Sequence, residues 1–327
     1  MTTPIPAAQG ENAALSVSLS RYKLFFAPLQ GYTHLAFRRA HHSLVGGVDA
    51  YFTPFLRIEH GSLRKKDLYD LDPLANDGIP TVPQIIVKNR DEMCFLCDAL
   101  QHLGWHRIDI NMGCPFPLQT GAGRGAALLS HPERVEPLLR EVSKRPDVAF
   151  SIKMRLGMDH ADEALRLLPL LNEAPLHSIT LHPRLATQQY RGAVSLDDFS
   201  RFYDSCRHPL IFNGDILSVS DISSLASRFP SLYGFMIGRG LLRIPTMHLP
   251  ALSSEQRIQA LFSLHDALYS DAMRRLQGPQ QQLNHLSAFW HYQEDQLPKK
   301  IYKKLTKAGS LRNYDSALSQ LKVQLSS

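Results

Sequence analysis

A cysteine stands where a short strand should end. Residues 107–111 alternate isoleucine with polar residues, and this period of two predicts a strand that delivers Asn111 and Cys114 to its carboxyl end. Chemistry at that point is one interpretation of the cysteine, because functional residues are concentrated in shaped loops. The alternative is an inert cysteine that packs as a small hydrophobic residue.

The loop after this cysteine is rich in proline and glycine. Pro115 and Pro117 argue against regular helix or a central strand, because proline lacks an N–H donor and has a fixed φ angle. Gly121, Gly123 and Gly125 permit backbone conformations and close approaches that a side chain would block. We therefore predict a shaped, non-helical loop beside the cysteine.

Charged residues close two further apolar segments. Residues 148–157 predict a strand, and Lys153 and Arg155, two positions apart, share one face near its end. His182 and Arg184 stand at the end of the next predicted strand. A solvated lysine and a structural histidine are the ordinary alternatives, but polar groups that close apolar strands more often face a site.

Strands of this kind recur along the chain. Apolar runs near residues 24, 49, 82, 107, 148, 177, 209 and 232 each predict a strand, and all but the second are followed by helical periodicity. Eight such units predict an α/β fold, a (β/α)8 TIM barrel, whose functional residues lie at the carboxyl ends of the strands. We expect Thr33 to cap the first helix, and Ser130 to cap the helix that has Pro132 at its first position.

The chain divides into three parts. Residues 1–20 lack a sustained apolar period, which predicts a flexible tail, and residues 21–244 hold the barrel. Over residues 245–327 glycine nearly vanishes and amphipathic patterns predict a small C-terminal α-helical domain. Five lysines in residues 298–307 surround an apolar stripe and form either a solvated face or a row of phosphate-binding groups.

The composition is that of an ordinary globular protein. Of 327 residues, 44% are hydrophobic and 20% charged, and the net charge of +6 weakly favours a polyanionic partner. Four cysteines are too few for a disulfide framework, the N-terminus does not resemble a signal peptide, and no apolar run approaches the ~20 residues of a membrane span. We expect a soluble, cytoplasmic monomer.

Cys94 and Cys97 form a C-x-x-C pair on the apolar side of a predicted helix. A zinc site would need two more ligands at a recognisable spacing, and the sequence shows no second pair. We therefore expect these cysteines to pack in the core, and we expect no metal site.

The residues around Cys114 also match a known pattern. Asn111-x-Gly-Cys-Pro, followed by Gly-x-Gly-x-Gly-Ala-x-Leu-Leu at residues 121–129, resembles the signature of the tRNA-dihydrouridine synthases, and the likeness covers nearly the whole chain after residue 20. The resemblance implies reduction of the C5=C6 bond of specific uridines in tRNA, with NADPH or NADH as electron donor and bound FMN as cofactor. The uridine would have to flip out of the folded tRNA.

The resemblance also implies that Cys114 is the catalytic residue. It would act as a general acid and protonate C5 from the face opposite hydride delivery. A thiol with an ordinary pKa of about 8.5 is protonated at neutral pH and suits this task without special activation.

Binding residues are implied at the ends of the strands. The implied flavin contacts are Pro28, Leu29, Gln30, Gln84, Lys153, His182, Asn213, Gly214, Asp215, Gly238 and Arg239, and the implied substrate contacts are Asn111, Arg155 and Arg184. The Lys153 cation would favour the anionic reduced flavin, and the small residues that end the last two strands would hold its phosphate. The alternative for Gln84 is a strand-end amide bonded to neighbouring backbone.

Some features leave the assignment open. Phe116 and Pro117 stand where many family members have a small residue and then a lysine. The contacts of this loop with tRNA can therefore differ from those in other family members. Thr53-Pro-Phe-Leu-Arg57 resembles the subgroup that acts on uridine 16, but the match is too short to settle the position. Two other functions remain: an FMN-dependent barrel that reduces a free small molecule, of the dihydroorotate dehydrogenase or ene-reductase kind, and a tRNA-binding protein without turnover.

Overall fold

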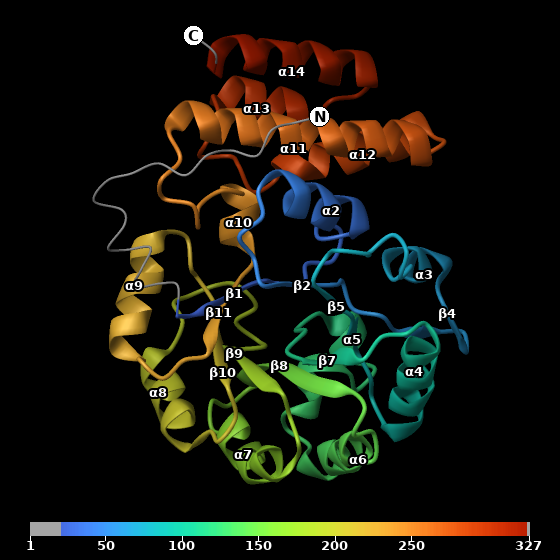
Figure 1. Cartoon of the computed structure of the whole chain (residues 1–327), viewed down its shortest axis with the longest axis vertical. Coiled ribbons are helices and arrows are strands. Elements are labelled where there is room, and N and C mark those ends of the chain that lie inside the picture. Colours follow the sequence, from blue (N-terminus) through green and yellow to red (C-terminus); the bar gives the residue numbers. More distant parts are fainter. Residues whose placement is uncertain (1–20, 326–327) are drawn as a thin grey trace.

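Buried parallel strands form the centre of the protein (Figure 1). The computed structural model describes residues 21–325. The strands of the sheet are β1 (Lys23–Phe26), β2 (Ala50–Phe52), β5 (Thr81–Val82), β6 (Gln84–Ile85), β7 (Arg107–Met112), β8 (Ala149–Gly157), β9 (Ser178–Leu185), β10 (Leu210–Asn213) and β11 (Gly234–Ile237). Most of their residues are buried on both faces of the sheet, as in parallel sheets covered by helices.

A proline divides the third strand of the barrel into β5 and β6. Pro83 has no N–H to donate to a neighbouring strand, so the ladder breaks there, although its carbonyl accepts a hydrogen bond from Asp109 N at 2.8 Å. β5 pairs with β2 and β6 pairs with β7, so the interrupted segment closes the sheet. With β5 and β6 counted as one, the described residues contain the eight barrel strands that the sequence predicted, and the TIM barrel is confirmed.

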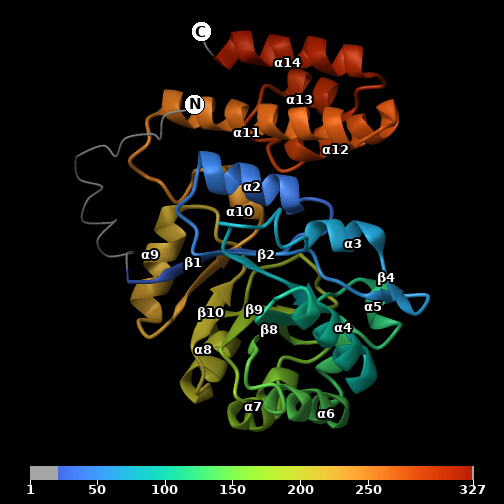
Figure 2. The ribbon, with the colours of Figure 1, turned by 45° about the vertical axis from the view of Figure 1, so that its right-hand side comes forward.

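Helices alternate with the strands and cover the outside of the barrel (Figures 1 and 2). They are α2 (Leu35–Leu44), α3 (Lys65–Asp70), α4 (Arg90–His102), α5 (Pro117–Thr120), the 3-10 helix η1 (Gly125–Leu128), α6 (Pro132–Ser143), α7 (Glu163–Glu173), α8 (Leu196–Ser205), α9 (Val219–Arg228) and α10 (Arg239–Arg243). The second strand, for which no helix was predicted, is followed by a hairpin of β3 (Ile58–Glu59) and β4 (Ser62–Leu63) and then by the short α3.

Two predicted helix caps are wrong. The side chain of His34, and not of Thr33, caps α2, because the Thr33 hydroxyl is hydrogen-bonded within the preceding loop. α6 begins after His131, and Ser130 donates its hydroxyl to Glu163 Oε2 at 2.9 Å. In both cases another hydrogen bond takes the group that would have capped the helix.

The proline-rich loop contains helix, contrary to expectation. α5 begins at Pro117 because the first helical N–H has no intrahelical acceptor, so a missing donor costs nothing there. η1 follows at Gly125, where φ is +63°, a left-handed value that glycine adopts without strain. The shaped loop is therefore a short helical turn beside the cysteine.

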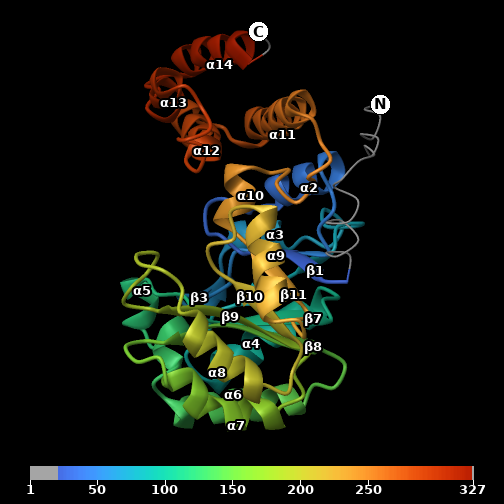
Figure 3. The same ribbon diagram turned by 90° about the vertical axis from the view of Figure 1, so that its left-hand side faces the viewer.

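Up to residue 325, four helices follow the barrel: α11 (Ser254–Arg275), α12 (Pro279–Trp290), α13 (Lys299–Thr306) and α14 (Leu311–Leu325). They bury a core of their own, in which Trp290 Nε1 donates to the Tyr314 hydroxyl at 2.7 Å. They stack beyond α2 and α10, away from α6 and α7 (Figures 1 and 3). The domain boundary at residue 245 remains a prediction, and the predicted tail lies outside the described residues.

The two cysteines of α4 differ in their burial. Cys97 packs in the barrel core, as predicted, whereas Cys94 is only half-buried. Over residues 21–325, no three metal-ligating side chains cluster as a metal ion would require. No helix in the same range is both long and apolar enough to cross a membrane.

Candidate active site

A cavity of about 180 Å³ lies at the carboxyl ends of the barrel strands. Every residue predicted to bind or to catalyse lines this cavity except Arg184, which is 2% exposed and lies behind the wall. Aromatic residues that were not assigned to the site also line it, namely Tyr32, Phe55, Phe116, Tyr190 and Tyr292. The fold thus brings into one cavity residues from most of the length of the chain.

A chain of hydrogen bonds fixes the signature strand. Ser151 Oγ donates to Asp109 Oδ1 at 2.6 Å, and Gln84 Nε2 donates to Asp109 Oδ2 at 2.7 Å. Asn111 Nδ2 then donates to Gln84 Oε1 at 2.8 Å, and Asn111 Oδ1 accepts from the backbone N–H of Cys114 at 2.9 Å. Gln84 therefore bonds neighbouring side chains, and it keeps one N–H and one lone pair for another partner.

Cys114 is held at the cavity wall by neighbours on several sides. It is 7% exposed and packs against Phe55 and Ile86. A Cβ on Gly125 would lie 2.8 Å from the Cys114 carbonyl oxygen, so this glycine of the signature is required by close packing. Burial raises the pKa of the Cys114 thiol, while the Phe116 N–H facing it acts in the opposite direction. The thiol therefore stays protonated at neutral pH.

Lys153 places a cation inside the cavity. Its Nζ donates to Asn213 Oδ1 at 2.8 Å, and Asn213 Nδ2 donates to the Met236 carbonyl at 2.6 Å, so β8, β10 and β11 are tied together at this point. Burial, together with the neighbouring Arg155, lowers the pKa of Lys153 to about 8. An ammonium has three N–H donors, so two remain available after the bond to Asn213.

Arg155 holds the loops around the cavity. Its guanidinium donates to the carbonyls of Gly113, Leu185 and Gln189 at 2.7–3.0 Å. Its 2% exposure shows that the group is nearly enclosed, and Tyr190 covers it at 5.4 Å from the ring centroid. The predicted role of Arg155 in substrate binding remains a prediction, because these donors are directed to the backbone.

His182, Arg184, Asp215 and Arg239 form one polar network at the ends of β9, β10 and β11. Arg184 forms an ion pair with Asp215, which also accepts from Arg239 Nη2 at 2.8 Å. Arg184 Nη1 donates to His182 Nε2 at 3.1 Å, so Nε2 is the unprotonated nitrogen of a neutral imidazole. Burial holds the pKa of His182 well below its usual value. Arg184 therefore positions two lining residues, Asp215 and His182.

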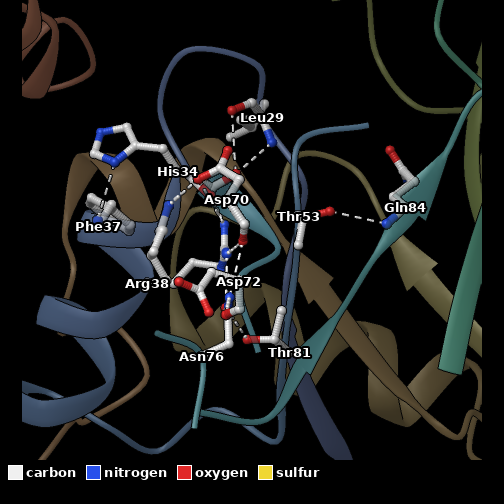
Figure 4. Close-up of polar contacts among 12 residues, drawn as sticks. Leu29, His34, Phe37, Arg38, Thr53, Asp70, Asp72, Asn76, Thr81 and Gln84 are labelled. Atoms are coloured by element: carbon white, nitrogen blue, oxygen red, sulfur yellow. Dashed lines mark hydrogen bonds and ion pairs between the residues drawn. The ribbon is translucent and has the colours of Figure 1, made fainter. Parts of the chain in front are cut away.

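A buried network supports the loop after β1 (Figure 4). Leu29 N donates to Thr33 Oγ1 at 2.8 Å, and Arg38 Nη1 donates to the Thr33 carbonyl at 2.9 Å. Arg38 is fully buried and also donates to the Asp70 carbonyl and to Asn76 Oδ1. The sequence pattern missed Arg38, because nothing local marks it as different from a surface arginine of an amphipathic helix.

Tyrosines from distant segments meet at the cavity. The Tyr292 ring lies edge-on to Tyr32 at 4.9 Å between centroids, and Arg239 lies over Tyr190 at 4.7 Å. Burial raises the pKa of Tyr292 to about 12. Tyr292 follows α12, so the C-terminal helices contribute directly to the cavity. Sequence reasoning missed this residue, because no motif surrounds it.

The walls and charges of the cavity suit an anionic ligand. A Cβ on Gly214 would lie 2.8 Å from His182 Cδ2, and one on Gly238 would lie 3.3 Å from Ala27 Cβ, so backbone forms the wall at the ends of β10 and β11. Lys153 and Arg239 supply positive charge to the same cavity. The arrangement places a protonated thiol in one cavity with groups that can hold an anion.

Comparison with known proteins gives a consistent picture. The family model described as dihydrouridine synthase matches residues 25–324. The tRNA-dihydrouridine(16) synthase of Haemophilus influenzae is 29% identical over 69% of this chain and 75% of its own length, and that of Pseudomonas putida is 29% identical over 68% and 72%. The tRNA-dihydrouridine synthase B of Pasteurella multocida is 28% identical over 68% of this chain and 67% of its own length.

Solved structures resemble the barrel. The old yellow enzyme of Trypanosoma cruzi superposes with a TM-score of 0.51 at 10% identity, over 72% of this chain and 90% of that structure. Morphinone reductase gives a TM-score of 0.50 at 10% identity, over 69% and 84%. At this identity the likeness concerns the fold alone.

Proposed function

Because the chain belongs to the dihydrouridine synthase family, we propose that it reduces a uridine of tRNA to dihydrouridine, and that the target is uridine 16. The position is supported by the names of the relatives from Haemophilus influenzae and Pseudomonas putida. It is also supported by the segment 53–57, whose Pro54 and Phe55 line the cavity beside Cys114.

The observation that carries this proposal is a buried, protonated thiol in the same cavity as a lysine cation and a neutral histidine. Reduction of a uridine C5=C6 bond needs a proton at C5 as well as a reductant. Cys114 can supply the proton, because burial raises the pKa of its thiol and Asn111 fixes its backbone.

The lining of the cavity supports FMN as the cofactor, and we infer that NADPH is the electron donor. When bound, FMN would take up reducing equivalents from NADPH and deliver a hydride to C6 of the uridine. Lys153 would bind the anionic edge of the cofactor with the two N–H donors that Asn213 leaves available. Arg239 and the glycine walls at Gly214 and Gly238 would hold the phosphate.

The remaining polar residues would orient the site. Since His182 accepts from Arg184 at Nε2, it offers an Nδ1–H donor to the bound molecules. Gln84 offers its second N–H and lone pair, and Arg155 keeps the loops around the cavity in place. We infer that the uridine leaves the tRNA stack to reach Cys114, because the thiol lies in a cavity.

Mass mapping of dihydrouridine in tRNA from a deletion strain tests the proposal. We expect dihydrouridine at position 16 to disappear and to return when the gene is supplied on a plasmid. Dihydrouridine unchanged at every position of the tRNA in that strain would contradict the proposal. Reoxidation of the reduced holoenzyme by free pyrimidines but not by tRNA would favour the small-molecule reductase instead.

A further inference from the structure

Phe116 is a half-exposed aromatic residue at the edge of the cavity. It follows Cys114 by two residues and lines the same cavity, and 50% of it is accessible. Leu118, two residues further on, is 72% exposed but does not line the cavity. Isolated exposed apolar residues are common on proteins, so it is the position of Phe116 that needs an explanation.

The backbone of Phe116 is held in one conformation. Prolines 115 and 117 flank it, and its carbonyl accepts from Gln119 N at 2.8 Å and from Thr120 N at 3.0 Å. Its N–H faces the Cys114 thiol. No further ordering of this backbone is needed when a ligand covers the ring, and this favours binding.

The surroundings favour a nucleic acid over a protein as the occupant. Tyr190, 40% exposed, lies against both Arg239 and Arg155 on the same cavity. Aromatic rings near cations are one arrangement with which proteins bind single-stranded nucleic acid, and here the exposed Tyr190 ring is the group available for contact, because Arg155 is enclosed. The lysine-bearing α13 lies on the same side of the molecule as α5 in Figure 3.

We propose that Phe116 stacks on an unpaired base of the tRNA that neighbours the target uridine. The inference rests on the proposed function, because a uridine that flips out leaves the bases beside it without a stacking partner. A planar ring at the entrance replaces that partner and holds the RNA in the open conformation. Stacking on an aromatic ring tolerates any base, so it adds affinity and orientation without reading sequence.

The test compares Phe116→Ala with Phe116→Trp, and uses Leu118→Ala as the matched control. Dissociation constants of the holoenzyme for unmodified tRNA are measured over a range of salt concentrations. We expect Phe116→Ala to raise the Kd about 5- to 100-fold. The slope of log Kd against log salt should stay at the wild-type value, because the number of neutralised phosphates is the same. Phe116→Trp and Leu118→Ala should stay within about twofold of wild type.

Three further measurements separate stacking from damage to the site. FMN content and the rate of NADPH oxidation should be unchanged in Phe116→Ala. The pH profile of uridine reduction should also be unchanged, because alanine retains the backbone N–H that faces Cys114.

Wild-type affinity for tRNA in Phe116→Ala would overturn the inference. An equal loss of affinity in Leu118→Ala would also overturn it, because it would indicate a general apolar surface such as one that binds a protein. A weaker salt dependence in Phe116→Ala, or failure of tryptophan to restore binding, would also overturn it. If the wild-type protein neither binds nor modifies tRNA, the proposed function itself fails. If wild type modifies tRNA and Phe116→Ala binds it equally well, only the stacking role fails.

Discussion

The cavity and helix α13 both carry cations, but they hold them in opposite ways. In the cavity, Lys153 is half-buried and Arg155 is enclosed, and each donates a hydrogen bond to an acceptor of the barrel. On α13, Lys299, Lys300 and Lys303 are exposed, and they form no ion pair with any acidic group among residues 21–325. Hydrogen-bonded cations in a cavity have one orientation and strong local fields, whereas exposed cations attract distant phosphates and are screened by salt.

This difference suits the cavity to catalysis and suits α13 to binding tRNA. Burial shifts the pKa values of Cys114 and Lys153, so the cavity can position a proton and a charge. The apolar side of α13 is buried through Ile301 and Leu305, so its lysines face solvent, as the sequence predicted. Tyr292 is the exception to this division, because it belongs to the C-terminal helices and yet lines the cavity.

The largest effect is expected for Cys114→Ala. Without the proton donor, uridine reduction should slow by about 10²–10⁴-fold while FMN content and NADPH oxidation remain at the wild-type level. Single-turnover reduction of tRNA measures the rate of uridine reduction. Flavin absorbance measures the FMN content and the reaction with NADPH. Cys94→Ala, at the half-buried cysteine of α4, is the control. Equal damage to NADPH oxidation in Cys114→Ala would assign the cysteine to packing.

Lys153→Met should have the second largest effect. It removes the cation in the cavity, so we expect weaker FMN binding and roughly 10²-fold slower reduction of the holoenzyme by NADPH. Lys144→Met is the matched control, since the Lys144 side chain is 62% exposed and its replacement should change stability by a few tenths of a kcal/mol at most. Flavin content after purification and the FMN dissociation constant test whether Lys153 binds the cofactor. Identical values in both variants would place Lys153 outside the cofactor site.

Replacing Lys299, Lys300, Lys303 and Lys304 together by Gln tests the other side of the comparison. We expect tRNA affinity to fall roughly 10- to 100-fold at low salt. The slope of log affinity against log salt should decrease by nearly one for each phosphate that the variant no longer neutralises. FMN content should not change.

The control for the lysine variant replaces four exposed cations at the opposite end of the molecule by Gln. They are Arg140 on α6, Lys144 at the C-terminal end of α6, Arg166 on α7 and Arg201 on α8. It changes the net charge equally. If affinity falls equally in both variants, total charge matters and α13 has no special role.

The smallest effect is a pH dependence. Because the pKa of Lys153 is lowered to about 8, its cation is present below pH 8 and disappears as the pH rises through that value. The FMN dissociation constant should therefore rise about tenfold between about pH 7 and pH 9, and the Lys153→Met variant should show no such rise. Fluorescence titration of the apoprotein measures both curves. A flat wild-type curve would show that the lysine charge does not bind the cofactor.

The sequence by itself determined the barrel and most of the polar residues of the cavity. Strand periodicity is a local property, and eight strand–helix units place every strand end at one mouth. Most candidates at strand ends, such as Asn111, Lys153 and His182, therefore line one cavity. The apolar stripe of α13 could be predicted for the same local reason.

Only the tertiary structure decided where side chains direct their hydrogen bonds. Arg184 lies behind the wall, where it pairs with Asp215, which is 31 residues away in the sequence. Ser130 does not cap α6, because its hydroxyl bonds to Glu163, 33 residues away. Tyr292 reaches the cavity because the C-terminal helices pack beside α2. Periodicity and propensity describe the backbone near a residue, whereas these interactions depend on which distant groups the packed chain brings within about 3 Å.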